Sequence, residues 1–194
     1  YRKGNDLFEK IGNHNCQTKN KINISNIMYM LGEKEDALLI LKELEKDPIV
    51  QQDTSYLVNV LISLYSVSDK TEKDCPQRAY TLAQKLKYNP LITLSLQTMG
   101  IDAYDNNEPD SALFYFRKAL NSAFNNNNVY QIVPLLKEIS ETHIILNNPD
   151  SAYHYMILAN TYEDSLLNQE KIIELSKSES KAVIAKYEND LKQV

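Results

Sequence analysis

The sequence has few of the features that mark an enzyme or a nucleic-acid-binding protein. Its 194 residues contain no Gly-x-Gly-x-x-Gly or Gly-x-x-x-x-Gly-Lys-Ser/Thr loop to hold phosphates, no His-Glu-x-x-His zinc motif and no Gly-x-Ser-x-Gly nucleophile elbow. The formal net charge is -5, and lysines and arginines are scattered among acidic residues, so no basic face is expected to neutralise phosphates. We therefore predict no catalytic residues, no cofactor and no nucleic-acid partner for this segment.

Cysteine, glycine and long apolar runs are also scarce. Cys16 and Cys75 lie far apart without a Cys-x-x-Cys spacing, and His14 near Cys16 lacks the further ligands that a zinc ion needs. We predict no metal site, and the redox compartment stays open. The four glycines and the lack of an Asn-Gly pair disfavour β-hairpins. No run reaches the roughly 18 apolar residues that a membrane-spanning helix needs.

One phrase recurs along the chain. It reads NNEPDSALFYFRKAL at residues 106–120, NNPDSAYHYMILA at 147–159 and CPQRAYTLAQKL at 75–86, with a proline three residues before a key alanine. A degenerate copy, GEKEDALLILKEL at 32–44, lacks the proline. The key alanines Ala37, Ala79, Ala112 and Ala152 are 42, 33 and 40 residues apart, a spacing typical of stacked repeat units.

Each copy has the pattern of a helix and follows a second apolar stretch of helical length. The proline suits a first helical turn, and the apolar residues after Pro109 recur at intervals of three and four. The preceding stretches cover residues 22–31, 56–67, 91–104 and 135–146, with an insertion expected near residues 68–74. Because one helix pair cannot bury its own apolar face, the pairs must stack on one another. The sequence predicts an all-α chain of about four helix pairs.

The third unit resembles the tetratricopeptide repeat (TPR) family. Its matching residues are Leu96, Met99, Gly100, Ala112, Phe116 and Ala119. The fourth unit matches at Leu136, Ile139, Ala152, Met156 and Ala159, but it has Ser140 in place of the glycine. The resemblance covers about residues 17–163 and implies a right-handed superhelical stack of about four TPR-like helix hairpins, whose first helices line a concave, ligand-binding surface. We take residues 1–163 as this repeat domain.

Residues 164–194 are expected to form a long C-terminal capping or exit helix. Leu166, Leu167, Ile172, Ile173 and Leu175 suit a cap on the last unit, and SKSES at 176–180 is a polar break. Beyond it, a stripe of Ile184, Tyr187, Leu191 and Val194 predicts a seam against another helix, in this molecule or in a second copy as a homodimer.

The tail also resembles a junction found in membrane-anchored TPR regulators and sensor kinases of Bacteroidetes. The matching residues lie in YEDSLLNQEK, residues 162–171, and in KYE, residues 186–188. This resemblance implies a periplasmic, extracytoplasmic sensor domain for signal transduction, followed by a membrane tether beyond Val194. The chain, which starts at Tyr1 and stops within a helical pattern, is expected to be part of a longer protein.

Binding of a protein or peptide is the function that the TPR resemblance implies. Its concave groove positions are occupied here by Asn26, Tyr29, Tyr65, Gln97, Ile101, Tyr104, Lys137 and Glu141. A tyrosine at such a position either contacts a ligand or packs between helices. The TPR positions that grip a C-terminal carboxylate hold Ile22, Asn26, Asn59, Leu94 and Thr98, so the three cations needed are missing.

Two other functions remain open. The first is a soluble cytoplasmic scaffold for protein–protein interaction, which a membrane segment just beyond Val194 would disfavour. The second is a small enzyme around His143 and His154, which would need a deep pocket with a titrating group beside a histidine. Packing within the helix pair is the simpler role for both histidines.

Overall fold

The computed structural model describes residues 14–192, which are all-helical and contain no strand. The helices are α2 (His14–Met30), α3 (Lys34–Lys46), α4 (Pro48–Gln52), α5 (Thr54–Val67), α6 (Cys75–Leu86), α7 (Asn89–Asp105), α8 (Pro109–Asn125), α9 (Val129–Ile145) and α10 (Pro149–Lys192). The prediction of an all-α chain is therefore confirmed.

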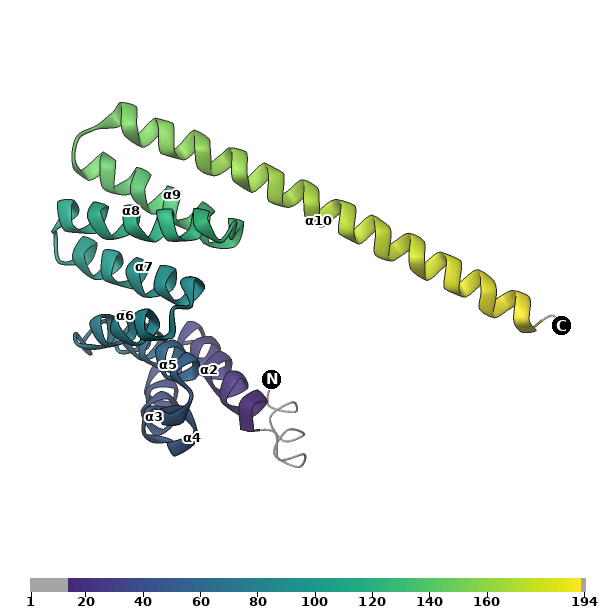
Figure 1. The fold of residues 1–194 in the computed structure, drawn as a ribbon, viewed down its shortest axis with the longest axis horizontal. Coiled ribbons are helices and arrows are strands. Elements are labelled where there is room, and N and C mark those ends of the chain that lie inside the picture. Colours follow the sequence, from purple (N-terminus) through teal and green to yellow (C-terminus); the bar gives the residue numbers. More distant parts are fainter. Residues whose placement is uncertain (1–13, 193–194) are drawn as a thin grey trace.

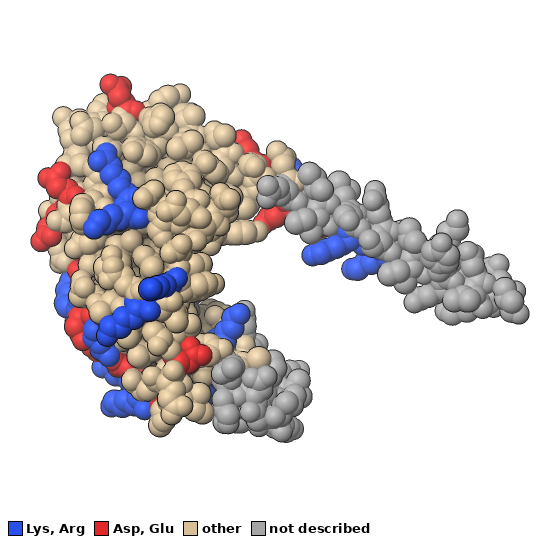
Figure 2. Space-filling view, viewed as in Figure 1, with Lys and Arg blue, Asp and Glu red and all other residues tan. Residues whose placement is uncertain are grey.

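The helices pack in chain order as pairs. Helix α2 contacts α3, α5 contacts α6, α7 contacts α8 and α9 contacts α10, and each pair also touches the next. The first helices of the pairs form a row of their own, because α2 contacts α5, α5 contacts α7, and α7 contacts α9. Figure 1 shows the pairs layered from α2 and α3 at one end to α9 and α10 at the other. Figure 2 shows that this body curves around a hollow on the side toward which α10 projects.

The repeated phrase marks where one helix ends and its partner begins. Asn107 has a φ of 60° and Asn147 a φ of 56°, the left-handed conformation that ends a helix. After α7, the backbone N–H of Asn107 donates to the carbonyl of Tyr104 at 3.1 Å, and that of Glu108 donates to Ala103 at 2.9 Å. These two bonds form a Schellman motif. The proline two residues later then starts the next helix, where a missing N–H costs nothing.

Small residues let the two helices of a pair approach closely. An added Cβ on Gly100 of α7 would lie 2.5 Å from two ring carbons of Phe116 on α8, so only glycine fits there without a shift. At the corresponding place in the next pair, Ser140 is buried and its hydroxyl donates to the carbonyl of Ala152 at 2.7 Å. This bond satisfies the buried hydroxyl, so a serine is accommodated where the preceding unit has a glycine.

Two clusters of buried side chains form the core. The first lies in α2 to α6 and ends at Leu91 in α7, and the second runs from Leu96 in α7 to Ala159 in α10. Ile92 packs against both clusters. The repeated alanines are all buried between helices: Ala79, Ala112, Ala119, Ala152 and Ala159. Their small size allows the short distances between helix axes that ridge-and-groove packing requires.

Helices α9 and α4 depart from the sequence-based prediction. Helix α9 starts at Val129, six residues earlier than expected, and accommodates Pro134 in its interior. Helix α4 has only five residues, too few to show a helical period, and Asp47 caps it by accepting from the N–H of Ile49 at 2.8 Å. The insertion expected near residues 68–74 is the long connection between α5 and α6.

Helix α10 is continuous over 44 residues, about 66 Å at the usual rise. It passes without a break through residues 176–180 and across the expected boundary between residues 163 and 164. Leu166 is half-buried and Leu167 is exposed, so only the former shields the last pair. The remaining predicted capping and seam side chains lie outside the side chains that the structure describes: Ile172, Ile173, Leu175, Ile184, Tyr187, Leu191 and Val194.

Within residues 14–192, no helix is both long and apolar enough to cross a membrane.

Candidate functional site

A niche opens between the first helices of the third and fourth pairs. It has a volume of about 170 Å³ and is lined by Ile101 and Tyr104 of α7, Phe116 of α8, and Glu138 and Glu141 of α9. Ile101, Tyr104 and Glu141 were expected from the sequence to face a groove. Since three helices contribute side chains, the stacking of the third pair on the fourth creates this niche.

Glu138 has a carboxylate that is only partly satisfied. Its Oε1 accepts a hydrogen bond from Nε2 of Gln97 at 2.8 Å. Its Oε2 is buried and has no hydrogen-bond partner. Burial raises the pKa of Glu138 to about 7, the bond from Gln97 opposes the rise, and the nearby charge of Glu141 adds to it. A carboxyl group that exchanges its proton near neutral pH therefore lies in this niche.

The other residues of the niche give it a mixed apolar and acidic character. Phe116 is 1% exposed and forms an apolar wall, while Ile101 and Tyr104 are half-buried and Glu141 is exposed. No basic residue belongs to this lining. A bound group that combines an apolar part with a positive charge would meet complementary surfaces here.

The predicted groove residues Gln97 and Lys137 do not line the niche, and each contacts a side chain of a neighbouring helix. Gln97 bridges α7 and α9 through its bond to Glu138. Lys137 contacts α10 instead, since its Nζ lies 2.8 Å from Oε2 of Glu163 in that helix. Lys137 is thus paired with an acid from another helix.

The predicted groove tyrosines of the first two pairs bond to the following pair. The hydroxyl of Tyr65 donates to Oδ1 of Asp102 at 2.5 Å, and the hydroxyl of Tyr29 donates to Oδ1 of Asp69 at 3.0 Å. Tyr65 is 1% exposed and Tyr29 37%. Burial and the bond to Asp102 raise the pKa of Tyr65, so it stays protonated as a donor. We therefore leave the buried Tyr65 out of the binding surface and assign it to packing.

A second hollow, of about 520 Å³, lies along the same row of first helices, between α2 and α5. Asn26, the remaining predicted residue, is half-buried on α2 but does not line it. The hollow has a mixed polar and apolar lining, formed by Lys19, Ile22, Asn23, Asp53, Ser55, Tyr56, Asn59 and Tyr88. Among the positions that the TPR resemblance implies for binding a C-terminal carboxylate, Ile22 stands in place of a cation and Asn59 matches the expected asparagine.

The two histidines flank a tyrosine. The buried ring of His143 stacks on Tyr155 with centroids 5.5 Å apart, and the exposed ring of His154 makes a T-shaped contact with Tyr155, with centroids 5.6 Å apart. Burial and the charge of Arg117, whose Nη2 lies 3.5 Å from Nε2 of His143, lower the pKa of His143. Nδ1 of His143 is buried without a hydrogen-bond partner. This geometry is that of an aromatic stack between α9 and α10.

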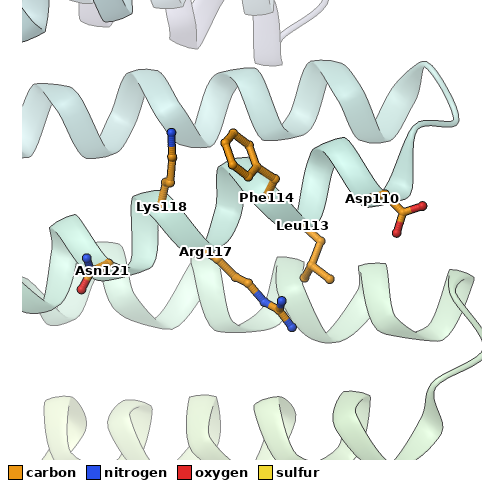
Figure 3. Close-up of a pocket in the computed structure, with 6 residues that line it drawn as sticks. All are labelled: Asp110, Leu113, Phe114, Arg117, Lys118 and Asn121. Atoms are coloured by element: carbon orange, nitrogen blue, oxygen red, sulfur yellow. The ribbon is translucent and has the colours of Figure 1, made fainter.

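The outer surface of α8 carries a shallower depression of about 420 Å³ (Figure 3). All its lining residues come from α8: Asp110, Leu113, Phe114, Arg117, Lys118 and Asn121. Nζ of Lys118 lies 4.3 Å from the ring centroid of Phe114, so this aromatic face already has a cation from its own helix. On the face shown in Figure 2, acidic and basic side chains occur in small groups separated by uncharged residues.

Sequence reasoning missed Glu138 and Phe116 as parts of the site. The repeat register contained a signal for Glu138, because residue 138 corresponds to residue 98, 40 positions earlier, where a buried threonine stands. An acid at a position that packs between first helices is unusual. Phe116 was recognised only as a packing residue of the TPR pattern.

Within residues 14–192, no group of three or more histidine, cysteine or acidic residues could hold a metal ion. In comparisons with known proteins, no family model matches the chain and no curated protein is significantly similar to it.

Proposed function

We propose that the chain is a non-enzymatic, TPR-like repeat domain that binds an extended segment of a protein or peptide. The proposed architecture is a right-handed superhelical stack of four helix hairpins, with the first helices α2, α5, α7 and α9 forming the binding surface. The resemblance of units three and four to the TPR pattern and the row of contacts between these helices support it.

The observation that carries the proposal is the pair of hollows along the row of first helices. One lies between α2 and α5 and the other between α7 and α9, and both have mixed polar and apolar linings. An extended peptide places successive side chains on alternating sides, so it suits two separated hollows better than a compact small molecule does. Aromatic, amide and acidic groups in the linings offer both contact area and hydrogen bonds.

The experiment is selection of a random peptide library displayed on phage, with affinities measured by fluorescence anisotropy. We expect Ile101→Ala, in the groove, to weaken a selected peptide about tenfold, as truncation of a binding hot spot does. The matched control is Phe114→Ala on the outer face of α8, which should change the affinity less than about twofold. Failure to select any binding peptide, or selective loss of binding in Phe114→Ala, would refute the proposal.

The biological setting that we propose is a periplasmic sensor domain of a membrane-tethered regulator. The support is the resemblance of residues 162–171 and 186–188 to the junction in such proteins, together with the projection of α10 away from the helix pairs (Figure 1). In this setting a ligand would change the relative rotation of the pairs and so tilt α10. Hydrogen exchange of residues 184–191 with and without a selected peptide tests the coupling, and unchanged exchange would count against it.

A further inference from the structure

The niche between α7 and α9 has the size of one amino-acid side chain. Its volume of about 170 Å³ equals that of about six liquid waters at roughly 30 Å³ each. Ile101 and Phe116 supply apolar surface, and the carboxylates of Glu138 and Glu141 supply negative charge. Long basic side chains combine an apolar stem with a charged end in the same way.

We infer that this niche binds one lysine or arginine side chain of the bound peptide, with the stem against Ile101 and Phe116 and the cation between Glu138 and Glu141. This inference rests on the proposed peptide-binding function and names the chemistry that the peptide must carry.

The unpaired oxygen of Glu138 distinguishes a cation from other occupants. A neutral apolar side chain would fill the niche but would leave Oε2 of Glu138 buried and without a partner, at a cost in free energy. An anion would face two acids, and the nearest basic residue of α9, Lys137, is already paired with Glu163. A primary ammonium or a guanidinium group supplies several N–H donors and completes the bonding of Oε2.

The geometry also predicts that binding and proton release are linked. Glu138 has a pKa of about 7 because it is buried. Glu141 lies beside it on α9, and Gln97 and Tyr104 face it from α7. A cation pairs with the ionised form, so binding must displace the proton from the protonated fraction. Affinity should therefore rise about tenfold between pH 6 and pH 8, over which the ionised fraction rises about tenfold.

The test uses capped single amino acids and the full 194-residue chain with ¹³C-labelled isoleucine methyl groups. The Ile101 methyl signal, identified by its loss in Ile101→Val, reports on the niche by NMR. The probes are N-acetyl-lysine methylamide, its uncharged analogue N-acetyl-norleucine methylamide, and spermidine as a free amine. We expect the lysine probe to shift this signal and to bind at least tenfold more tightly than the norleucine probe.

Glu138→Gln is the decisive variant, and Glu174→Gln, an exposed position on α10, is its control with the same change in charge. At pH 8 we expect Glu138→Gln to weaken the lysine probe at least tenfold and Glu174→Gln to change it less than twofold. Equal binding of the lysine and norleucine probes, or unchanged binding by folded Glu138→Gln, would overturn the inference. If Glu138→Gln does not fold, the pH dependence of the wild-type chain decides, and an affinity equal at pH 6 and pH 8 would overturn it.

Two further outcomes separate this inference from the proposed function. If selected peptides bind the groove and lose no affinity when each lysine and arginine is replaced by norleucine, the inference fails and the proposed function stands. If spermidine binds at least tenfold more tightly than the lysine probe, or if the lysine probe binds while no peptide does, the niche is a site for free amines and the peptide assignment fails.

Discussion

At the scale of single residues, Glu138 should make stability depend on pH. Burial raises its pKa from 4.5 to about 7 in the folded chain. Between these values the folded state keeps a proton that the unfolded state releases, so the free energy of unfolding must fall as pH rises from about 4.5 to 7 and then level off. Glu138→Gln removes this titration, and we expect it to be more stable than the wild type at pH 8 by on the order of 2 kcal/mol.

Urea unfolding of both proteins between pH 4.5 and 8 measures this effect. The difference between the two curves isolates Glu138 from the other acids, which titrate in both proteins. Parallel curves for the two proteins would show that the niche does not perturb this carboxyl group.

Gly100 offers a second prediction at the residue scale. In Gly100→Ala the new methyl group would lie 2.5 Å from ring carbons of Phe116, whose ring is buried and has little freedom to move. Overpacking of this kind costs about 1–3 kcal/mol, which exceeds the gain of up to about 1 kcal/mol from the higher helix propensity of alanine. We expect a net loss of about 1–2 kcal/mol in thermal or urea unfolding.

Phe116→Leu in the same chain checks that the clash is the cause. The double variant Gly100→Ala/Phe116→Leu should be less destabilised than the sum of its two single variants, because the smaller side chain makes room for the methyl group. Strict additivity of the two changes would exclude this explanation.

At the scale of elements, the sequence predicts helices where a chemical signal fixes their ends. The prolines Pro109 and Pro149 mark helix starts, and the asparagines before them take up the left-handed conformation that ends the preceding helix. The apolar stretch expected at residues 135–146 begins directly after Pro134, yet this proline lies in the interior of a helix that begins at Val129. Tertiary packing of Ile132 and Val133, both buried, outweighs that local signal.

The candidate site is predictable only in part for a related reason. The TPR resemblance implies groove positions at Ile101, Tyr104 and Glu141, and these three residues line the niche. It does not reveal that Oε2 of Glu138 lacks a partner, because that depends on which groups of α7 and α8 reach the carboxylate. Nor does it show that Tyr65 is buried while Tyr29, its counterpart, is partly exposed.

This pair of tyrosines gives a prediction about contacts between elements. Tyr65→Phe removes the buried hydroxyl that donates a hydrogen bond to Asp102. Burial raises the pKa of Asp102, but the hydrogen bonds from Tyr65 and Lys73 outweigh this effect and keep the pKa below its usual value. Asp102 retains Lys73 at 3.0 Å, so we expect a loss of about 1–2 kcal/mol rather than the full value for a bond to a charged group. Tyr29→Phe, at a more exposed bond to Asp69, should cost less than about 0.5 kcal/mol in the same urea titration. Equal losses in the two variants would contradict the role assigned to burial.

At the scale of the whole molecule, cooperativity depends on how the two core clusters are joined. Each helix pair mainly contacts its neighbours, so stability spreads along the chain through successive interfaces. The first cluster ends at Leu91 and the second begins at Leu96, and Ile92 packs against both. A change at this residue should therefore weaken the coupling between the halves as well as the local packing.

We expect Ile92→Ala to lower the free energy of unfolding by about 1–2 kcal/mol and to reduce the m value of urea unfolding, because the halves then unfold over different urea ranges. Ile62→Ala is the matched control, since Ile62 is also partly buried but packs only against the first cluster. It should shift the midpoint and leave the m value of the transition unchanged. Far-UV circular dichroism measures both variants, and hydrogen exchange of α5 and α8 shows which half opens first. If Ile92→Ala keeps the wild-type m value, and if α5 and α8 exchange with the same opening free energy, the junction does not control cooperativity. A signal from the groove would then have to travel through other contacts between α6 and α7.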